Sequence, residues 1–144
     1  LHPGRDVPEH SPRKEWLKYG SDIKTRDSYR NNVLGIMYTA EGRKQPLLLM
    51  TFAYFTPGKG EVAEDSAYVR FTEIWGDAPN VRLGIEEHNR ALRELAGEGG
   101  VIFLDQRKLM GNNKEYFTDI CHFSDKGSEV FVQNMVDKIE EEGF

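Results

Sequence analysis

A carboxylate and an imidazole lie three residues apart near the C-terminal end of this chain, at Asp119 and His122. Histidine is the side chain that ordinarily titrates near neutral pH, and a neighbouring carboxylate fixes its tautomer and stabilises its charged form. With a nucleophilic hydroxyl, such a pair would make a catalytic triad. The sequence therefore predicts acid–base catalysis here. The structural alternative is that Asp119 accepts backbone N–H bonds at the entrance to a helix and that His122 is merely exposed.

Two short apolar segments predict the strands that position this pair. Residues 47–53 and 101–104 show no alternation of polar and apolar residues and are bounded by turn-forming residues. Such segments are typical of parallel strands that are covered on both faces. Asp105 follows the second segment, where it could line a site or fix the next loop, and the loop-fixing role is the favoured prediction.

Helical spacing of apolar residues predicts three helices around these strands. The first runs from Asp27 to near Gly42, the second covers residues 85–96, and the third follows Ser124, which can cap its first turn. His88 falls on the apolar face of the second helix and is expected to be a partly buried, satisfied side chain. The predicted apolar face of the third helix is made of Val132, Met135, Val136 and Ile139, with Phe131 beside it.

The alternation of helices and strands predicts an α/β fold with a parallel sheet. The carboxyl ends of parallel strands share one edge of the sheet, so the loops over residues 54–80 and 105–123 should border one crevice. Tyr54, Phe55 and Trp75 in the first loop are the candidate substrate-binding residues, as a wall or a lid. They could equally form a small core within the loop itself.

Length and composition fit one domain over residues 1–144, opened by an irregular arm over residues 1–26 that is rich in proline and glycine. The net charge of −5 is made of interspersed charges, which argues against nucleic acid as a partner. No apolar run is long enough to span a bilayer. The sequence does not indicate in which cellular compartment the protein resides. The single cysteine, Cys121, excludes an internal disulfide, and it is expected to be a buried apolar residue rather than a nucleophile.

Three stretches follow one another in an order that resembles a known family: His88-Asn89 with residues 92–96, residues 100–105, and Asp119-x-x-His122 followed by Ser124-x-x-Gly127. Over residues 27–142 the chain is similar to the SGNH (GDSL-type) hydrolases. The resemblance implies a flavodoxin-like three-layer α/β/α sandwich and hydrolysis of esters, including lipids, acetylated sugars and thioesters, without a metal or organic cofactor. By position, His122 would activate a serine and Asp119 would orient His122.

Other parts of the family pattern do not occur in this chain. The family carries its nucleophile in a Gly-Asp-Ser segment and oxyanion donors in a Gly-x-Asn-Asp segment, and neither is present. We therefore expect a truncated domain, the C-terminal half of such an enzyme, that is inactive and poorly stable alone. Its exposed sheet edge could pair with the missing half or with another chain. One alternative is a non-catalytic carbohydrate- or ligand-binding α/β module. Another is a nucleotide-binding flavodoxin-like domain, which the lack of a glycine-rich phosphate loop disfavours.

Overall fold

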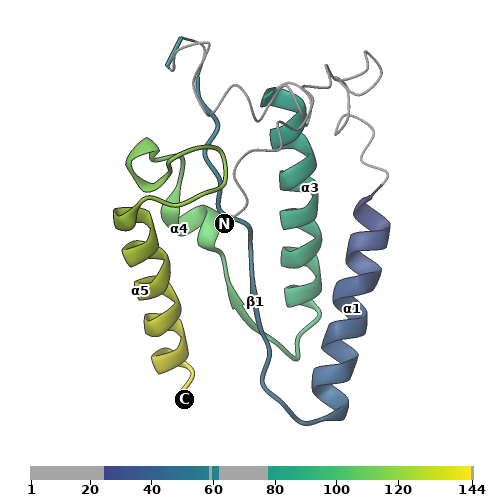
Figure 1. Ribbon diagram of the computed structural model, residues 1–144. Coiled ribbons are helices and arrows are strands. Elements are labelled where there is room, and N and C mark those ends of the chain that lie inside the picture. Colours follow the sequence, from purple (N-terminus) through teal and green to yellow (C-terminus); the bar gives the residue numbers. More distant parts are fainter. Residues whose placement is uncertain (1–24, 59, 62–77, 144) are drawn as a thin grey trace, which may run out of the picture.

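The computed structural model describes residues 25–58, 60–61 and 78–143 (Figure 1). The elements in chain order are α1 (Arg26–Gly42), β1 (Leu48–Met50), α3 (Ala78–Gly97), β2 (Ile102–Leu104), α4 (Gln106–Met110), the 3₁₀ helix η2 (Lys114–Tyr116) and α5 (Asp125–Glu141). The described part of the chain is thus a mixed helix–strand fold. None of its helices is long and apolar enough to cross a membrane.

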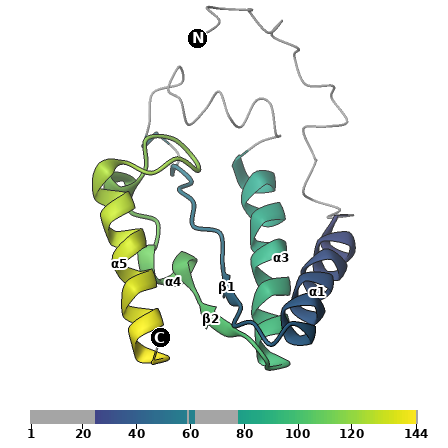
Figure 2. The same cartoon turned by 60° about the horizontal axis from the view of Figure 1, so that its bottom comes forward.

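The two strands form a small parallel sheet. Leu49 pairs with Phe103, and Met50 pairs with Leu104. In both views the strands lie between α5 on one side and α3 with α1 on the other (Figures 1 and 2). Among the described residues β1 pairs with no strand except β2, so its second edge carries no ladder there. The parallel pairing confirms the predicted strand direction.

One part of the core joins α1 and α3 to β1. Its buried members are Val33, Leu49, Leu92 and Leu95. Burying an aliphatic side chain of this size contributes about 1.5–3 kcal/mol, so this cluster holds the two helices against the strand. Arg26 of α1 pairs with Glu94 of α3, and Arg30 of α1 pairs with Glu98, which directly follows α3. Such partly exposed ion pairs contribute little.

The second part of the core lies under the loops that follow the strands. Its buried members are Ala53, Phe55, Met110 and Phe117, and Phe123 and Phe131 pack against them. Aromatic rings carry much of this packing: Phe123 lies 5.3 Å from Phe117 and 5.0 Å from Phe131, measured between ring centroids. This cluster ties α5 to the loop that contains Asp119 and His122.

The predicted helices and strands are present, with different bounds. The strand predicted over residues 47–53 is a ladder only over Leu48–Met50. Because β2 ends at Leu104 and the chain turns into α4, residues 51–53 have no partner strand among the described residues. Cover on both faces was predicted for residues 47–53, but within the ladder only Leu49 is buried, while Leu48 and Met50 are half-buried. Beyond the ladder, Thr51 and Ala53 are buried and Phe52 is exposed. The long loops are shorter than predicted, because α3 begins at Ala78 and because α4 and η2 lie within residues 105–123.

The predicted apolar face of α5 is wrong at three of its four residues, whereas Met135 is half-buried. Val132, Val136 and Ile139 are 55%, 40% and 36% exposed. The inward face instead carries Gly127, which is buried, and Phe131. Apolar residues occur on both sides of this helix, so spacing alone could not select the inner one; tertiary contacts at its first turn do so.

Candidate functional site

A short hairpin-like loop over residues 116–124 presents the acid–base pair. Phe117 and Phe123 form an antiparallel bridge, and the N–H of Ser124 donates to the carbonyl of Tyr116 at 3.0 Å. Nearer the tip, the N–H of Thr118 donates to the carbonyl of His122 at 2.8 Å. These hydrogen bonds join the two sides of the loop and so fix the backbone conformation of its tip.

Asp119 and His122 are in direct contact at this tip. Oδ2 of Asp119 lies 2.6 Å from Nδ1 of His122, while Oδ1 accepts the backbone N–H groups of Cys121 and His122, each at 2.8 Å. The side chain of His122 is 66% exposed, whereas that of Asp119 is 15% exposed. The carboxylate therefore does both jobs considered from the sequence: it fixes the loop and it holds the ring.

The surroundings of Asp119 favour its charged form. Burial alone would raise the pKa of Asp119, but hydrogen bonds from the N–H groups of Cys121 and His122 and from the imidazole outweigh burial and hold that pKa below its usual range. Burial and the negative charge of Asp119 raise the pKa of the Cys121 thiol. The thiol is thus protonated at neutral pH. Cys121 was predicted to be buried, but it is only half-buried.

The loop rests on the core through Ile120, which is 2% exposed. Its carbonyl accepts the N–H of Phe55 at 2.9 Å, and the ring of Phe55 stacks on Phe117. The segment that follows β1 therefore supports the loop that carries the pair. This support links the two segments that were predicted to border one crevice.

The first turn of α5 fixes the other end of the loop. Oγ of Ser124 accepts the N–H of Gly127 at 3.1 Å, which confirms the predicted cap, and donates to the carbonyl of Glu115 at 2.6 Å. Gly127 touches the backbone of Tyr116 so closely that a Cβ would overlap the carbonyl oxygen. The prediction that Gly127 permits close packing is confirmed.

The predicted substrate-binding aromatics lie in the interior where the structure describes them. Tyr54 and Phe55 are both 0% exposed. The hydroxyl of Tyr54 donates to Glu86 at 2.6 Å, and burial together with that bond raises the pKa of Tyr54 to about 12. Their contact with substrate stays a prediction, and Trp75 lies outside the described residues.

Asp105 fixes the start of α4, as favoured from the sequence. Its carboxylate accepts the hydroxyl of Thr51 at 2.7 Å, Nε of Arg93 at 2.8 Å and the backbone N–H of Lys108 at 3.2 Å. These three partners are structural groups of the chain itself. His88 is likewise satisfied, since its ring stacks on Tyr29 and its Nε2 lies 3.0 Å from the hydroxyl of Thr25.

Two asparagines that sequence reasoning missed hold the segment after β1 in an extended path. The side-chain amide of Asn89, which is 0% exposed, bonds both the N–H and the carbonyl of Phe52, at 2.7 and 2.9 Å. Asn112 does the same to Thr56, both at 3.0 Å. Each amide takes the place of a neighbouring strand. The signal for Asn89 was an amide on the apolar face of a predicted helix.

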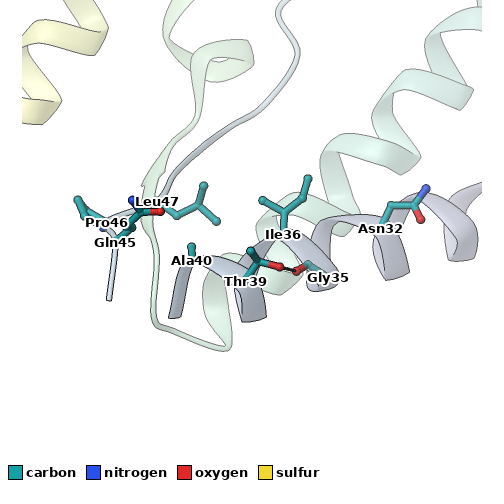
Figure 3. Close-up of a pocket in the computed structure, with 8 residues that line it drawn as sticks. All are labelled: Asn32, Gly35, Ile36, Thr39, Ala40, Gln45, Pro46 and Leu47. Carbon is teal, nitrogen blue, oxygen red and sulfur yellow. Dashed lines mark hydrogen bonds between the residues drawn. The ribbon is translucent and has the colours of Figure 1, made fainter. Parts of the chain in front are cut away.

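A depression at the other end of β1 has no catalytic side chain. Its lining residues come from α1 and the turn into β1: Asn32, Gly35, Ile36, Thr39, Ala40, Gln45, Pro46 and Leu47 (Figure 3). None of these side chains ionises near neutral pH. The chemistry of the described residues is therefore concentrated at the loop of Asp119 and His122 instead.

Comparisons with known proteins add no relative. No protein-family model, no curated protein and no solved structure matches the chain. The functional argument therefore rests on the residues and their geometry.

Proposed function

We propose that this chain carries the acid–base half of a serine ester hydrolase, in which His122 is the general base and Asp119 orients it. The observation that carries the proposal is the 2.6 Å contact between Oδ2 of Asp119 and Nδ1 of His122, with the ring 66% exposed. A half-buried carboxylate that holds an exposed imidazole is the arrangement that activates a hydroxyl nucleophile.

The hydrogen bonds at Asp119 favour one tautomer of His122. Oδ1 is occupied by two backbone N–H groups, so Oδ2 is the oxygen that accepts a proton donor from the ring. A neutral imidazole that donates from Nδ1 carries its lone pair on Nε2. Nε2 would then take the proton of an incoming serine hydroxyl.

The proposed reaction needs a serine from outside the described residues. Ser124 lies nearest in sequence to the pair, but its hydroxyl is already bonded to Glu115 and Gly127 as a helix cap. In the reaction, the serine oxygen would attack the ester carbonyl while His122 takes its proton. His122 would return that proton to the leaving alcohol, and a water activated by the same nitrogen would then hydrolyse the acyl-enzyme.

The proposal also includes a specific fold. Parallel strands between helices on two sides, and a strand edge without a ladder among the described residues, support a flavodoxin-like three-layer α/β/α sandwich of the SGNH type. Small esters, including acylated carbohydrates or lipids, are the proposed substrates. Tyr54, Phe55 and Trp75 remain the proposed substrate contacts, and the unpaired edge remains the proposed place for further strands.

The test uses the longest open reading frame that encodes these 144 residues. A fluorophosphonate should label one serine, and the protein should hydrolyse p-nitrophenyl acetate. Replacing Asp119 with asparagine should lower kcat by about 1,000-fold or more, because the ring loses the partner that sets its tautomer. His88→Gln is the matched control and should leave the rate unchanged, since the contacts of His88 with Thr25 and Tyr29, both described residues, are structural.

Two results would count against the proposal. An unlabelled protein without hydrolysis would favour the non-catalytic binding module. Equal rates in the Asp119→Asn variant and the parent protein would remove Asp119 from the mechanism. The 144-residue chain alone should show no turnover, and hydrolysis that depends on His122 in that chain would contradict the placement of the serine elsewhere.

A further inference from the structure

The loop of Asp119 and His122 contains a third side chain that the proposed hydrolysis does not use. Cys121 stands between them, and its Sγ lies 3.7 Å from Nδ1 of His122. No pair among the ligand atoms of Asp119, Cys121 and His122 is more than 4.8 Å apart. We propose that these three side chains bind one zinc-like divalent cation and that this binding switches the acid–base pair off.

The three atoms are close to the spacing that zinc requires. Tetrahedral zinc with bonds of about 2.0–2.1 Å to oxygen and nitrogen and about 2.3 Å to sulfur places its ligand atoms roughly 3.3–3.6 Å apart. The 3.7 Å distance between Sγ of Cys121 and Nδ1 of His122 exceeds this range by about 0.1 Å. The carboxylate oxygen of Asp119 and Sγ of Cys121 are at most 4.8 Å apart and must approach each other by up to about 1.2 Å. To reach this range, the 2.6 Å distance between Oδ2 of Asp119 and Nδ1 of His122 must increase by about 0.7 Å.

The backbone of the loop is already arranged for this opening. Oδ1 of Asp119 stays bonded to two backbone N–H groups, so Oδ2 can turn toward a cation without loss of the loop. The exposed ring of His122 gives a cation access from solvent. A thiolate, an imidazole and a carboxylate together favour zinc or cobalt over magnesium or calcium, which prefer oxygen ligands alone. Water would complete the four ligands.

Binding at this place would abolish base catalysis by a change of tautomer. The cation takes the position of the proton between Oδ2 of Asp119 and Nδ1 of His122. The neutral ring must then carry its proton on Nε2, so that nitrogen can no longer accept one from serine. The thiol of Cys121 releases its proton to solvent as its sulfur binds the metal. This inhibitory role rests on the proposed function, whereas the metal site itself does not.

The first experiment tests the site without enzyme activity. Cobalt(II) is titrated into the 144-residue chain, and the sulfur-to-cobalt charge-transfer band reports on Cys121, since the chain has no other cysteine. We expect one cobalt per chain, with competition by zinc. Cys121→Ser should abolish the band, and His122→Ala should weaken affinity at least about tenfold, because loss of even an outer partner changes affinity about 10–100-fold. Replacement of His2 and His10 by glutamine should leave the band intact.

The second experiment tests the inhibition. Hydrolysis by the longer gene product is measured with zinc and with a chelator, and each variant is compared with its own metal-free rate. Zinc should lower the parent rate at least tenfold, and Cys121→Ser should require at least about tenfold more zinc for the same effect. Absence of a cobalt–thiolate band, or one metal per two chains, would overturn the site. A cobalt–thiolate band in a protein that does not hydrolyse esters would support the metal site and reject the proposed function.

Discussion

Replacing Gly127 with alanine should disturb the end of the loop that carries the acid–base pair. Gly127 is buried in the first turn of α5, against the backbone of Tyr116. An added Cβ would overlap the carbonyl oxygen of Tyr116 and stand 2.7 Å from its carbonyl carbon and 2.9 Å from its Cα. The contacted atoms are backbone, and that carbonyl also accepts the N–H of Ser124 at 3.0 Å. Relief of the clash therefore moves the base of the loop.

The size of the effect follows from opposing contributions. Overpacking of a buried site costs about 1–3 kcal/mol, and weakening of the Tyr116–Ser124 bond adds about 1 kcal/mol. Alanine in place of glycine in a helix returns about 1 kcal/mol. The free energy of unfolding should thus fall by roughly 1–3 kcal/mol. At about 4 °C per kcal/mol for a chain of this size, Tm should drop by roughly 4–12 °C.

Thermal unfolding followed by circular dichroism measures this change, with Gly35→Ala as the matched control. Gly35 lies inside α1, and a Cβ built there meets no atom within 4 Å. The control should gain up to about 1 kcal/mol from helix propensity alone. If Gly127→Ala were as stable as the parent or matched the gain of the control, the close approach to Tyr116 would not be a constraint and the account of the loop would be refuted.

Three further predictions concern the groups around the sheet. Asn89→Ala should lower the free energy of unfolding by about 2 kcal/mol in urea titrations, while Asn112→Ala, which breaks the same type of clamp at an exposed site, should cost about 1 kcal/mol or less. Hydrogen bonds to Arg93, Thr51 and Lys108 outweigh burial and lower the pKa of Asp105. The charged carboxylate therefore stabilises the fold fully above the ordinary Asp pKa of 3.8, and this stabilisation is lost as the pH falls below that value. Acid unfolding curves of Asp105→Asn should not show this loss of stability. Burial and the hydrogen bond to Glu86 raise the pKa of Tyr54 to about 12. The neutral phenol therefore stabilises the fold fully below pH 10, and this stabilisation is lost as the pH rises from 10 toward about 12. Tyr54→Phe should make the stability independent of pH over that range in alkaline unfolding curves.

The sequence predicted what depends on local pattern. Apolar spacing placed α1, α3 and α5, and Ser124 marked the start of the last helix because a hydroxyl there satisfies an N–H of the first turn. The contact between Asp119 and His122 was foreseen for a similar reason, since the two residues lie three positions apart in one tight loop. Short-range chemistry of this kind is encoded within a few residues.

Long-range features could not be predicted in the same way. Asn89 bonds a residue 37 positions away, and nothing in a helical pattern reveals that an extended segment needs a substitute strand there. The buried face of α5 is set by Gly127 against Tyr116, so apolar residues such as Val132 end on the outside. The burial of Tyr54 depends likewise on Glu86 and Arg107, which come from α3 and α4. Such outcomes follow from tertiary contacts that periodicity does not contain.

The central claim is that His122 acts as the base of an ester hydrolase. The most direct test is kcat/KM for p-nitrophenyl acetate in the gene product that contains this chain, compared between the parent protein and His122→Ala. Removal of a general base should lower kcat/KM by about 100- to 10,000-fold while circular dichroism shows an unchanged fold. An equal kcat/KM in both proteins would contradict the account.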